Sequence, residues 1–269
     1  MLPLRNQNRL RAFAKTCVRG IFFLAPLLVS LWLAAAAPVH ADDRALQWRM
    51  KPLAVDGPVP YFIAPGLEEL GYRPQDEQLA EWALAAWSNA SEGVLCFYPA
   101  EGSKALLRIY WSPVAEGRYG QMQPIPVDKQ RGGEVYVRPH LLDLEQRAPE
   151  VGDLALADPV FRDAVVYLML LHEIGHALGL VHTLEVSDVM YFGGDALAYF
   201  RNYRGQLGTR ADIPRNSGLS PNDVARVRRL YPPTLWLKSR PVAEEETKIS
   251  NQAPASESAL HTTSGGGRK

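Results

Sequence analysis

The chain has 269 residues, with 29 basic and 29 acidic side chains, so its formal net charge is zero. A chain without an excess of basic residues gives no support to nucleic-acid binding. Roughly 190 residues lie between the two atypical ends of the chain, which is enough for one domain with a well-packed core.

The first 41 residues have the pattern of an export signal. Five basic side chains precede an apolar run at residues 21–37, and Val39-His40-Ala41 fits a signal-peptidase site with cleavage after Ala41. The run is nearly long enough to span a bilayer, so an uncleaved membrane anchor is the alternative. In either case we expect an exported catalytic domain, periplasmic or secreted from a bacterium, or anchored at the inner membrane.

Cleavage after Ala41 changes the charge and the cysteine count. Residues 1–41 hold five basic and no acidic side chains, so 24 basic and 29 acidic side chains remain, a net charge of −5. Cys96 is then the only cysteine, and an internal disulfide is impossible. We assign residues 42–238 to one domain and residues 239–269, which are polar, to a disordered tail.

The first half of the domain contains one predicted helix and several predicted strands. Residues 74–77 open a helix, because the apolar side chains that follow recur at helical spacing. Branched and aromatic side chains predict strands, which lie at residues 94–98, 105–111 and 132–137. Residues 119–125 form a poorer strand whose prolines suit the edge of a sheet.

The most informative feature is a group of two histidines and a glutamate that follows an apolar run. Residues 164–171 predict a buried helix that leads directly into His172 and Glu173. His172 and His176 are four residues apart, so they lie on one face of that helix and can bind one metal ion. Glu173 lies beside them without being a ligand.

A glycine places a third histidine near the same ion. Gly179 can adopt a left-handed conformation, end the helix and return the chain so that His182 becomes the third ligand. Three protein ligands leave the fourth tetrahedral position open for water, which distinguishes a catalytic zinc from a structural one. Three of the six histidines fall in this window of eleven residues, so chance is a poor explanation.

Two further elements follow the third histidine. Residues 187–191 contain a short turn with Met190 and Tyr191, and Met190 fits a soft apolar floor beneath the imidazoles. Ser220 and Pro221 predict the start of a last helix, with Asp223 in its first turn. Two prolines at residues 232–233 end that helix.

The extended zinc motif followed by a methionine turn resembles the metzincin metallopeptidases. Thr183 after the third histidine and Tyr191 after the methionine are most similar to the matrixin branch, and Phe192 stands where astacins carry a metal-side tyrosine. The resemblance covers residues 48–231. It implies an α+β fold, in which a twisted mixed sheet packs with a long first helix and an active-site helix, and a C-terminal helix closes the domain.

The sequence departs from the matrixin pattern in three places. Residues 121–123 and 135–137 lack the histidines of a second, structural zinc, so we expect one zinc ion. Neither cysteine lies in the inhibitory motif of the matrixin pro-segment. Residues 192–218 form a long loop insertion, which we expect to form a wall or lid of the pocket for the residue after the cut bond. A surface excursion with its aromatic side chains packed on the back of the domain is the alternative.

These features predict an exported zinc endopeptidase, a monomer that acts on protein or peptide substrates. Glu173 serves as general base and acid, and the substrate pairs antiparallel with the strand at residues 119–125. Glu185 and Asp188 are interpreted as loop and turn residues. Two alternatives stay open: a zinc-binding pseudoenzyme or interaction module with an occluded cleft, and a hydrolase of non-peptide amides such as those of cell-wall material.

Overall fold

The computed structural model describes residues 51–112, 119–142, 149–193 and 196–235, all of which belong to one compact unit, His40–Lys269. The predicted export signal at residues 1–41 and the predicted tail at residues 239–269 lie outside the described residues. No helix in the described part of the chain is both long enough and apolar enough to cross a membrane.

One mixed β-sheet forms the base of the domain. Its strands are β1 (Val59–Ile63), β2 (Phe97–Pro99), β3 (Leu107–Trp111), β4 (Gly120–Val127) and β5 (Gln130–Val137). Their order across the sheet is β2-β1-β3-β5-β4, and all neighbours are parallel except β4 and β5, which form an antiparallel hairpin. The predicted edge position of the strand near residues 119–125 is therefore confirmed, because β4 lies at the margin of the sheet.

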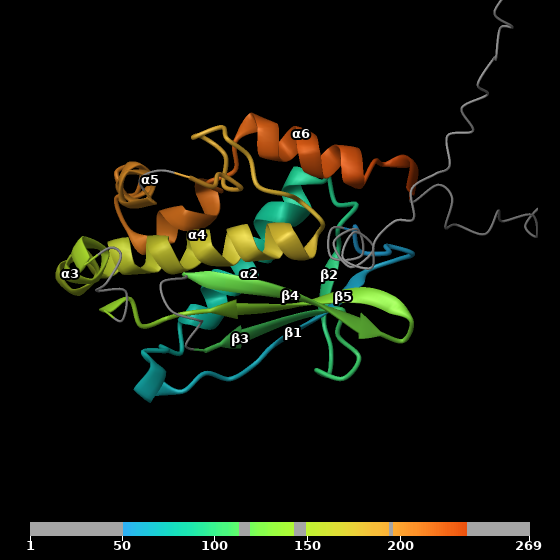
Figure 1. Cartoon of the computed structure of the whole chain (residues 1–269), viewed down its shortest axis with the longest axis horizontal. Coiled ribbons are helices and arrows are strands. Elements are labelled where there is room, and N and C mark those ends of the chain that lie inside the picture. The colour runs from blue at the N-terminus through green and yellow to red at the C-terminus, as the bar shows by residue number, and fades with distance from the viewer. Residues whose placement is uncertain (1–50, 113–118, 143–148, 194–195, 236–269) are drawn as a thin grey trace, which may run out of the picture. The chain divides into compact units, whose positions relative to one another are not determined.

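Helices cover one face of this sheet (Figure 1). The helices of the chain are η1 (Glu68–Leu70), α2 (Asp76–Ala90), α3 (Pro149–Ala157), α4 (Pro159–Ala177), α5 (Ala196–Arg204), η3 (Arg210–Arg215) and α6 (Pro221–Leu230), and all but the short η1 belong to this layer. α2 and α4 pack against each other and α4 packs on β4 and β5, while α5 and α6 lie beyond α4. The chain is thus an α+β protein with a mixed sheet, as the sequence predicts.

The alternation of side chains along β3 explains which face the helices cover. Leu107, Ile109 and Trp111 are buried beneath the helices, because successive side chains of a strand point to opposite faces. Tyr110 points to the other face, where its ring stacks on that of Tyr136 at 5.3 Å between centroids. The helical layer and the buried face of the sheet together enclose the hydrophobic core.

Two sequence predictions differ from the structure. Residues 94–96 are not part of a strand, because Glu92 and Gly93 turn the chain with positive φ and β2 begins only at Phe97. Residues 192–218 are not a plain loop, because their described part contains α5 and η3. The sequence reasoning also missed β1 and α3.

Candidate metal centre

The metal-binding motif lies at the end of the long buried helix α4. Asp158 caps the helix, accepting hydrogen bonds from the backbone N–H groups of Val160 (2.9 Å) and Phe161 (3.1 Å). Nearly every side chain of α4 is buried, and the indole N–H of Trp87 on α2 donates to the carbonyl of Leu171 at 3.0 Å. The cap fixes the start of the helix, and the Trp87 bond fixes it immediately before its first histidine.

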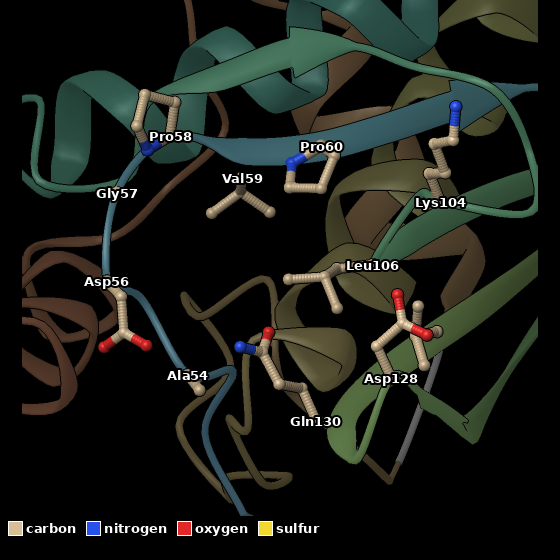
Figure 2. A pocket seen from close by; sticks show the side chains of 11 residues that line it. Ala54, Asp56, Gly57, Pro58, Val59, Pro60, Lys104, Leu106, Asp128 and Gln130 are labelled. Atoms are coloured by element: carbon tan, nitrogen blue, oxygen red, sulfur yellow. The ribbon is translucent and has the colours of Figure 1, made fainter.

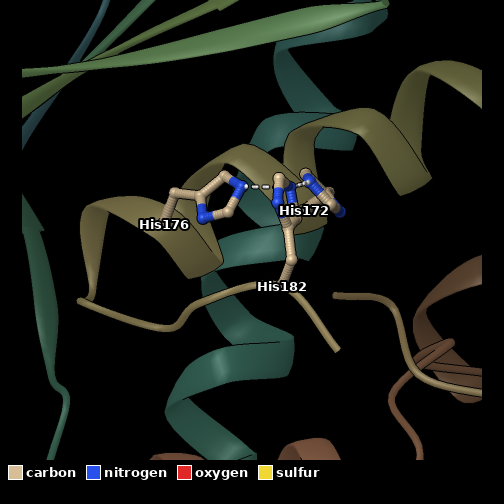
Figure 3. A group of neighbouring side chains, drawn as sticks. All are labelled: His172, His176 and His182. Carbon is tan, nitrogen blue, oxygen red and sulfur yellow. Dashed lines mark hydrogen bonds between the residues drawn. The ribbon is translucent and has the colours of Figure 1, made fainter. Parts of the chain in front are cut away.

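The turn after α4 brings the third histidine back to the helix. Gly179 has φ +96°, a conformation that favours glycine, and the N–H of Leu180 donates to the carbonyl of Gly175 at 2.9 Å. The Nε2 atom of His182 then lies 3.3 Å from Nε2 of His172 and 3.0 Å from Nε2 of His176 (Figure 3). The structure thus brings together the three residues predicted as ligands.

Backbone carbonyls determine which ring nitrogen of each helical histidine carries the proton. Nδ1 of His172 lies 2.7 Å from the carbonyl of Val189, and Nδ1 of His176 lies 2.9 Å from the carbonyl of Leu180. A carbonyl can only accept, so in the neutral rings Nδ1 is protonated and Nε2 keeps its lone pair. Lone pairs that converge at about 3 Å repel one another, whereas a cation between them would be bound, so this donor set fits a metal ion.

Burial keeps these imidazoles neutral. Burial and then the neighbouring His176 lower the pKa of His172 to about 3. Burial also lowers the pKa of His176 to about 4 and lowers that of the more exposed His182. Only neutral imidazole can donate a lone pair, so the three side chains are ready to bind a metal at neutral pH.

The depressed pKa values predict that the metal-free protein loses stability on mild acidification. In the unfolded chain histidine titrates near 6.5. Below that pH the unfolded state binds more protons than the folded state, so the free energy of unfolding falls by up to about 1.4 kcal/mol per pH unit for each of His172 and His176. Urea unfolding with a chelator at pH 7 and pH 5 measures the difference.

Other groups with shifted pKa values act below this interval or oppose the histidines, so a fall in stability between pH 7 and pH 5 reports the histidines. Burial raises the pKa of Asp158, but the hydrogen bonds from Arg204 and the backbone outweigh it and lower the pKa, so this group contributes only at lower pH. Burial raises the pKa of Asp223, so the folded state binds a proton at this group more readily than the unfolded state does. Acidification therefore stabilises the fold through Asp223 and opposes the effect of the histidines. His172→Asn should show a shallower decline, and equal stability of the unaltered protein at the two pH values would contradict the prediction.

The side chain of Glu173 on α4 packs against Gly120, the first residue of the edge strand. This side chain is buried, and a Cβ added to Gly120 would lie 2.7 Å from its Cγ and 3.0 Å from its Oε1. Glycine at the start of β4 therefore leaves room for this carboxylate in the position that it occupies. Glu173 is not in the three-histidine group, the only cluster of potential metal ligands among the described residues. Nothing in the sequence pattern pointed to Gly120.

The methionine turn packs against α4 and is tied to the loop of the third histidine. Met190 is fully buried, and a Cβ added to Gly175 would lie 2.5 Å from its sulfur. The N–H of Thr183 donates to the carbonyl of Met190 at 2.8 Å. The ring of Phe192 stacks on that of His182 at 4.5 Å between centroids and covers one of its faces.

Two buried carboxylates attach this turn to α6. Asp188 accepts hydrogen bonds from the Ser220 hydroxyl at 2.5 Å and the Asn222 amide at 2.6 Å. Asp223 accepts the N–H of Val189 at 2.8 Å, and the carbonyl of Val189 in turn holds His172. Asp188 therefore acts as a turn residue, in line with the sequence interpretation, and α6 supports the first ligand from behind.

The insertion packs on both α4 and the edge strand. Tyr203 of α5 stacks on Tyr167 of α4 at 5.9 Å, and its hydroxyl donates to the carbonyl of Asn216 at 2.6 Å. Phe200 contacts Tyr119, the residue before Gly120, edge-on at 5.2 Å. Tyr203 is thus anchored on the core, and Phe200 contacts the residue next to Gly120, against which Glu173 packs.

A separate cavity of about 250 Å³ lies elsewhere in the domain (Figure 2). It is formed by the starts of β1 and β3 and by the β4–β5 turn, and its polar lining includes Asp56, Lys104 and Asp128. None of the three histidines lines it, and neither does Glu173. This cavity is therefore not part of the candidate metal centre.

Comparisons with known proteins leave the family open. No protein-family model matches the chain, and no curated protein does. Among solved structures the chain matches the structure of myroilysin with a TM-score of 0.34 and 13% identity, over 68% of this chain and 97% of that chain. A likeness at this level carries no argument, so the function is inferred from the residues of the site.

Proposed function

We propose that this chain is a zinc-dependent endopeptidase of the metzincin type, similar to the matrixins. The observation that carries the proposal is the convergence of three neutral imidazoles, His172, His176 and His182, with a buried carboxylate on the adjacent helical position. A purely structural zinc site has no need of Glu173. The fourth position that three ligands leave open suits a substrate or water.

Zinc bound by the three histidines would polarise a substrate carbonyl and lower the pKa of a water molecule toward about 7. Glu173 takes the proton of the attacking water and returns it to the amine that leaves. Its burial against Gly120 restricts the orientations of the carboxylate, which favours proton transfer along one path.

The substrate binds as an extended strand along β4. An edge strand offers main-chain donors and acceptors to a peptide, so binding makes little demand on sequence. The contact between Gly120 and Glu173 supports this orientation, because a peptide paired with the start of β4 passes close to the general base.

The insertion forms one wall of the pocket for the residue after the cut bond. The part of the insertion that forms this wall is α5, whose Phe200 packs on Tyr119 beside the start of β4. The same helix is anchored on α4 through Tyr203, so the wall is part of the folded domain and is not a mobile lid.

The remaining features of the proposal follow from the sequence. The protein is exported, with residues 1–41 as a cleaved signal or an anchor, and acts as a monomer on protein or peptide substrates in the periplasm or beyond. It contacts a membrane only if the N-terminal segment stays uncleaved. The net charge of −5 after cleavage does not favour nucleic-acid partners.

Metal analysis and substrate profiling test this function together. The purified domain should hold about one zinc per chain, because there is one predicted ligand set, and should cleave peptide bonds in a denatured proteome. Two tightly bound zinc ions would contradict the single-site prediction. Zinc binding without proteolysis would favour a pseudoenzyme, or a hydrolase of non-peptide amides if such a substrate is cleaved instead.

A further inference from the structure

The carbonyl groups at the end of α4 include that of His176, the second proposed metal ligand. The last four carbonyls of an α-helix lack partners within the helix and must find them elsewhere. Here the carbonyl of Gly175 accepts the N–H of Leu180, and that of His176 accepts the N–H of Gly179 at 3.0 Å. The carbonyl of Leu178 accepts the hydroxyl of Tyr231 at 2.7 Å.

The side chain of Arg131 completes this set. Its Nη1 donates to the carbonyl of Ala177, and its Nη2 donates to the carbonyl of His176 at 3.2 Å. The guanidinium therefore bridges two successive carbonyls of the helix end, one of which belongs to a metal ligand. The planar fork of arginine matches this geometry, whereas the single ammonium of lysine does not.

Arg131 is built into the fold at this point. The residue belongs to β5, opposite Pro126 of the edge strand, and only 4% of its surface is exposed. A buried charge is costly unless its environment compensates it, and the negative end of the α4 dipole provides part of that compensation. Burial also lowers the pKa of this guanidinium from its usual value.

His176 is consequently fixed at two points. Its carbonyl is held by Arg131 and Gly179, and its imidazole Nδ1 by the carbonyl of Leu180 at 2.9 Å. A shift of the last turn of α4 would tilt this imidazole and displace the loop that leads to His182.

We infer that Arg131 is a positioning residue of the metal centre, which acts through the carbonyl of His176 to orient that imidazole and the turn to His182. The inference rests on the proposed function only in that the three histidines bind a metal. Groups that orient metal ligands typically contribute about 10- to 100-fold to metal affinity or activity.

Cobalt(II) titration of the full domain tests the inference, because the visible spectrum of bound cobalt reports ligand geometry. Arg131→Met should weaken cobalt affinity by about tenfold or more and alter the spectrum. Arg131→Lys keeps the positive charge but lacks the planar fork, so it should give an intermediate spectrum. This variant also tests the inference if Arg131→Met does not fold. Val135→Ala, at a buried position of the same strand, is the control for a general loss of stability.

The outcomes separate this inference from the proposed function. Native affinity and spectrum in both Arg131 variants, with stability reduced as in Val135→Ala, would overturn the inference and leave the metal site intact. Cobalt binding by the unaltered domain without peptide hydrolysis would reject the peptidase and not the role of Arg131. Failure of the unaltered domain to bind cobalt or zinc would reject both.

Discussion

Glu173→Gln is expected to retain its zinc and to lose peptide hydrolysis by a factor of about 10²–10⁴ or more. Glutamine has nearly the shape of glutamate, so it can occupy the space that Gly120 leaves beside α4. It cannot accept a proton, because its amide has no basic oxygen at neutral pH. The variant therefore removes the proposed chemistry while preserving the packing.

The loss should fall on kcat more than on KM, since proton transfer belongs to the transition state and the edge strand still binds the substrate. Glu185→Gln is the matched control: it is the same substitution on an exposed loop residue close to the third ligand. That variant should turn over like the unaltered enzyme. Glu173→Gln with near-native turnover and full zinc content would refute the proposed mechanism.

Local signals predicted much of the candidate site. The two helical histidines and Glu173 lie within one turn of helix, and the return to His182 needs only the left-handed Gly179. The last helix was equally predictable, because the capping box of Ser220 and Asp223 involves neighbours in the sequence. In each case the chemistry is determined by residues a few positions apart.

The supports of the site could not be predicted in this way. Asp223 and Val189 are 34 residues apart, and Arg131 and His176 are 45 residues apart. In the sequence alone Asp223 and Arg131 would read as ordinary surface charges, because burial and partners follow only from the packed fold. Gly120 is similar, since its importance comes from the Glu173 side chain that lies against it.

The helical part of the insertion differs from these supports, because a local signal accompanies it. Phe200, Tyr203 and Leu207 are all buried, at spacings of three and four residues, so a helical signal was present in the sequence. The glycines at residues 193, 194, 205 and 208 interrupt that signal and favour a loop instead. The same pattern means that deletion of the insertion would remove core side chains, so point variants are the better probes of the wall of the pocket.

A buried ion-pair network connects the insertion to the helices behind the site. Arg162 on α4 is 3% exposed and binds Asp76 at the start of α2, with Nη2 2.7 Å from Oδ2 and Nη1 on Oδ1. It also donates to the carbonyls of Gly71 and Pro139. Asp163 beside it binds Arg210 of η3 at 2.9 Å. This network fastens the start of α4 to α2 and to the insertion.

Arg162→Met is therefore expected to lower the free energy of unfolding by about 3–5 kcal/mol, because it leaves the Asp76 carboxylate buried without its cation. Such a loss is a large fraction of the ~5–15 kcal/mol that stabilises a typical domain. Urea unfolding at pH 7, followed by circular dichroism, measures it. Arg215→Met is the matched control, since Arg215 pairs with Asp212 at the surface and should change stability by no more than about 1 kcal/mol.

Adding Asp76→Asn to Arg162→Met should restore part of the stability, since the neutral amide removes the orphaned charge. Recovery should be incomplete, because the carbonyls of Gly71 and Pro139 still lack their donor and Asp76 also accepts the N–H of Arg73 at 2.9 Å. The stabilising network would be disproved by an Arg162→Met variant no less stable than Arg215→Met. Additive losses in the double variant would show instead that the two side chains act independently.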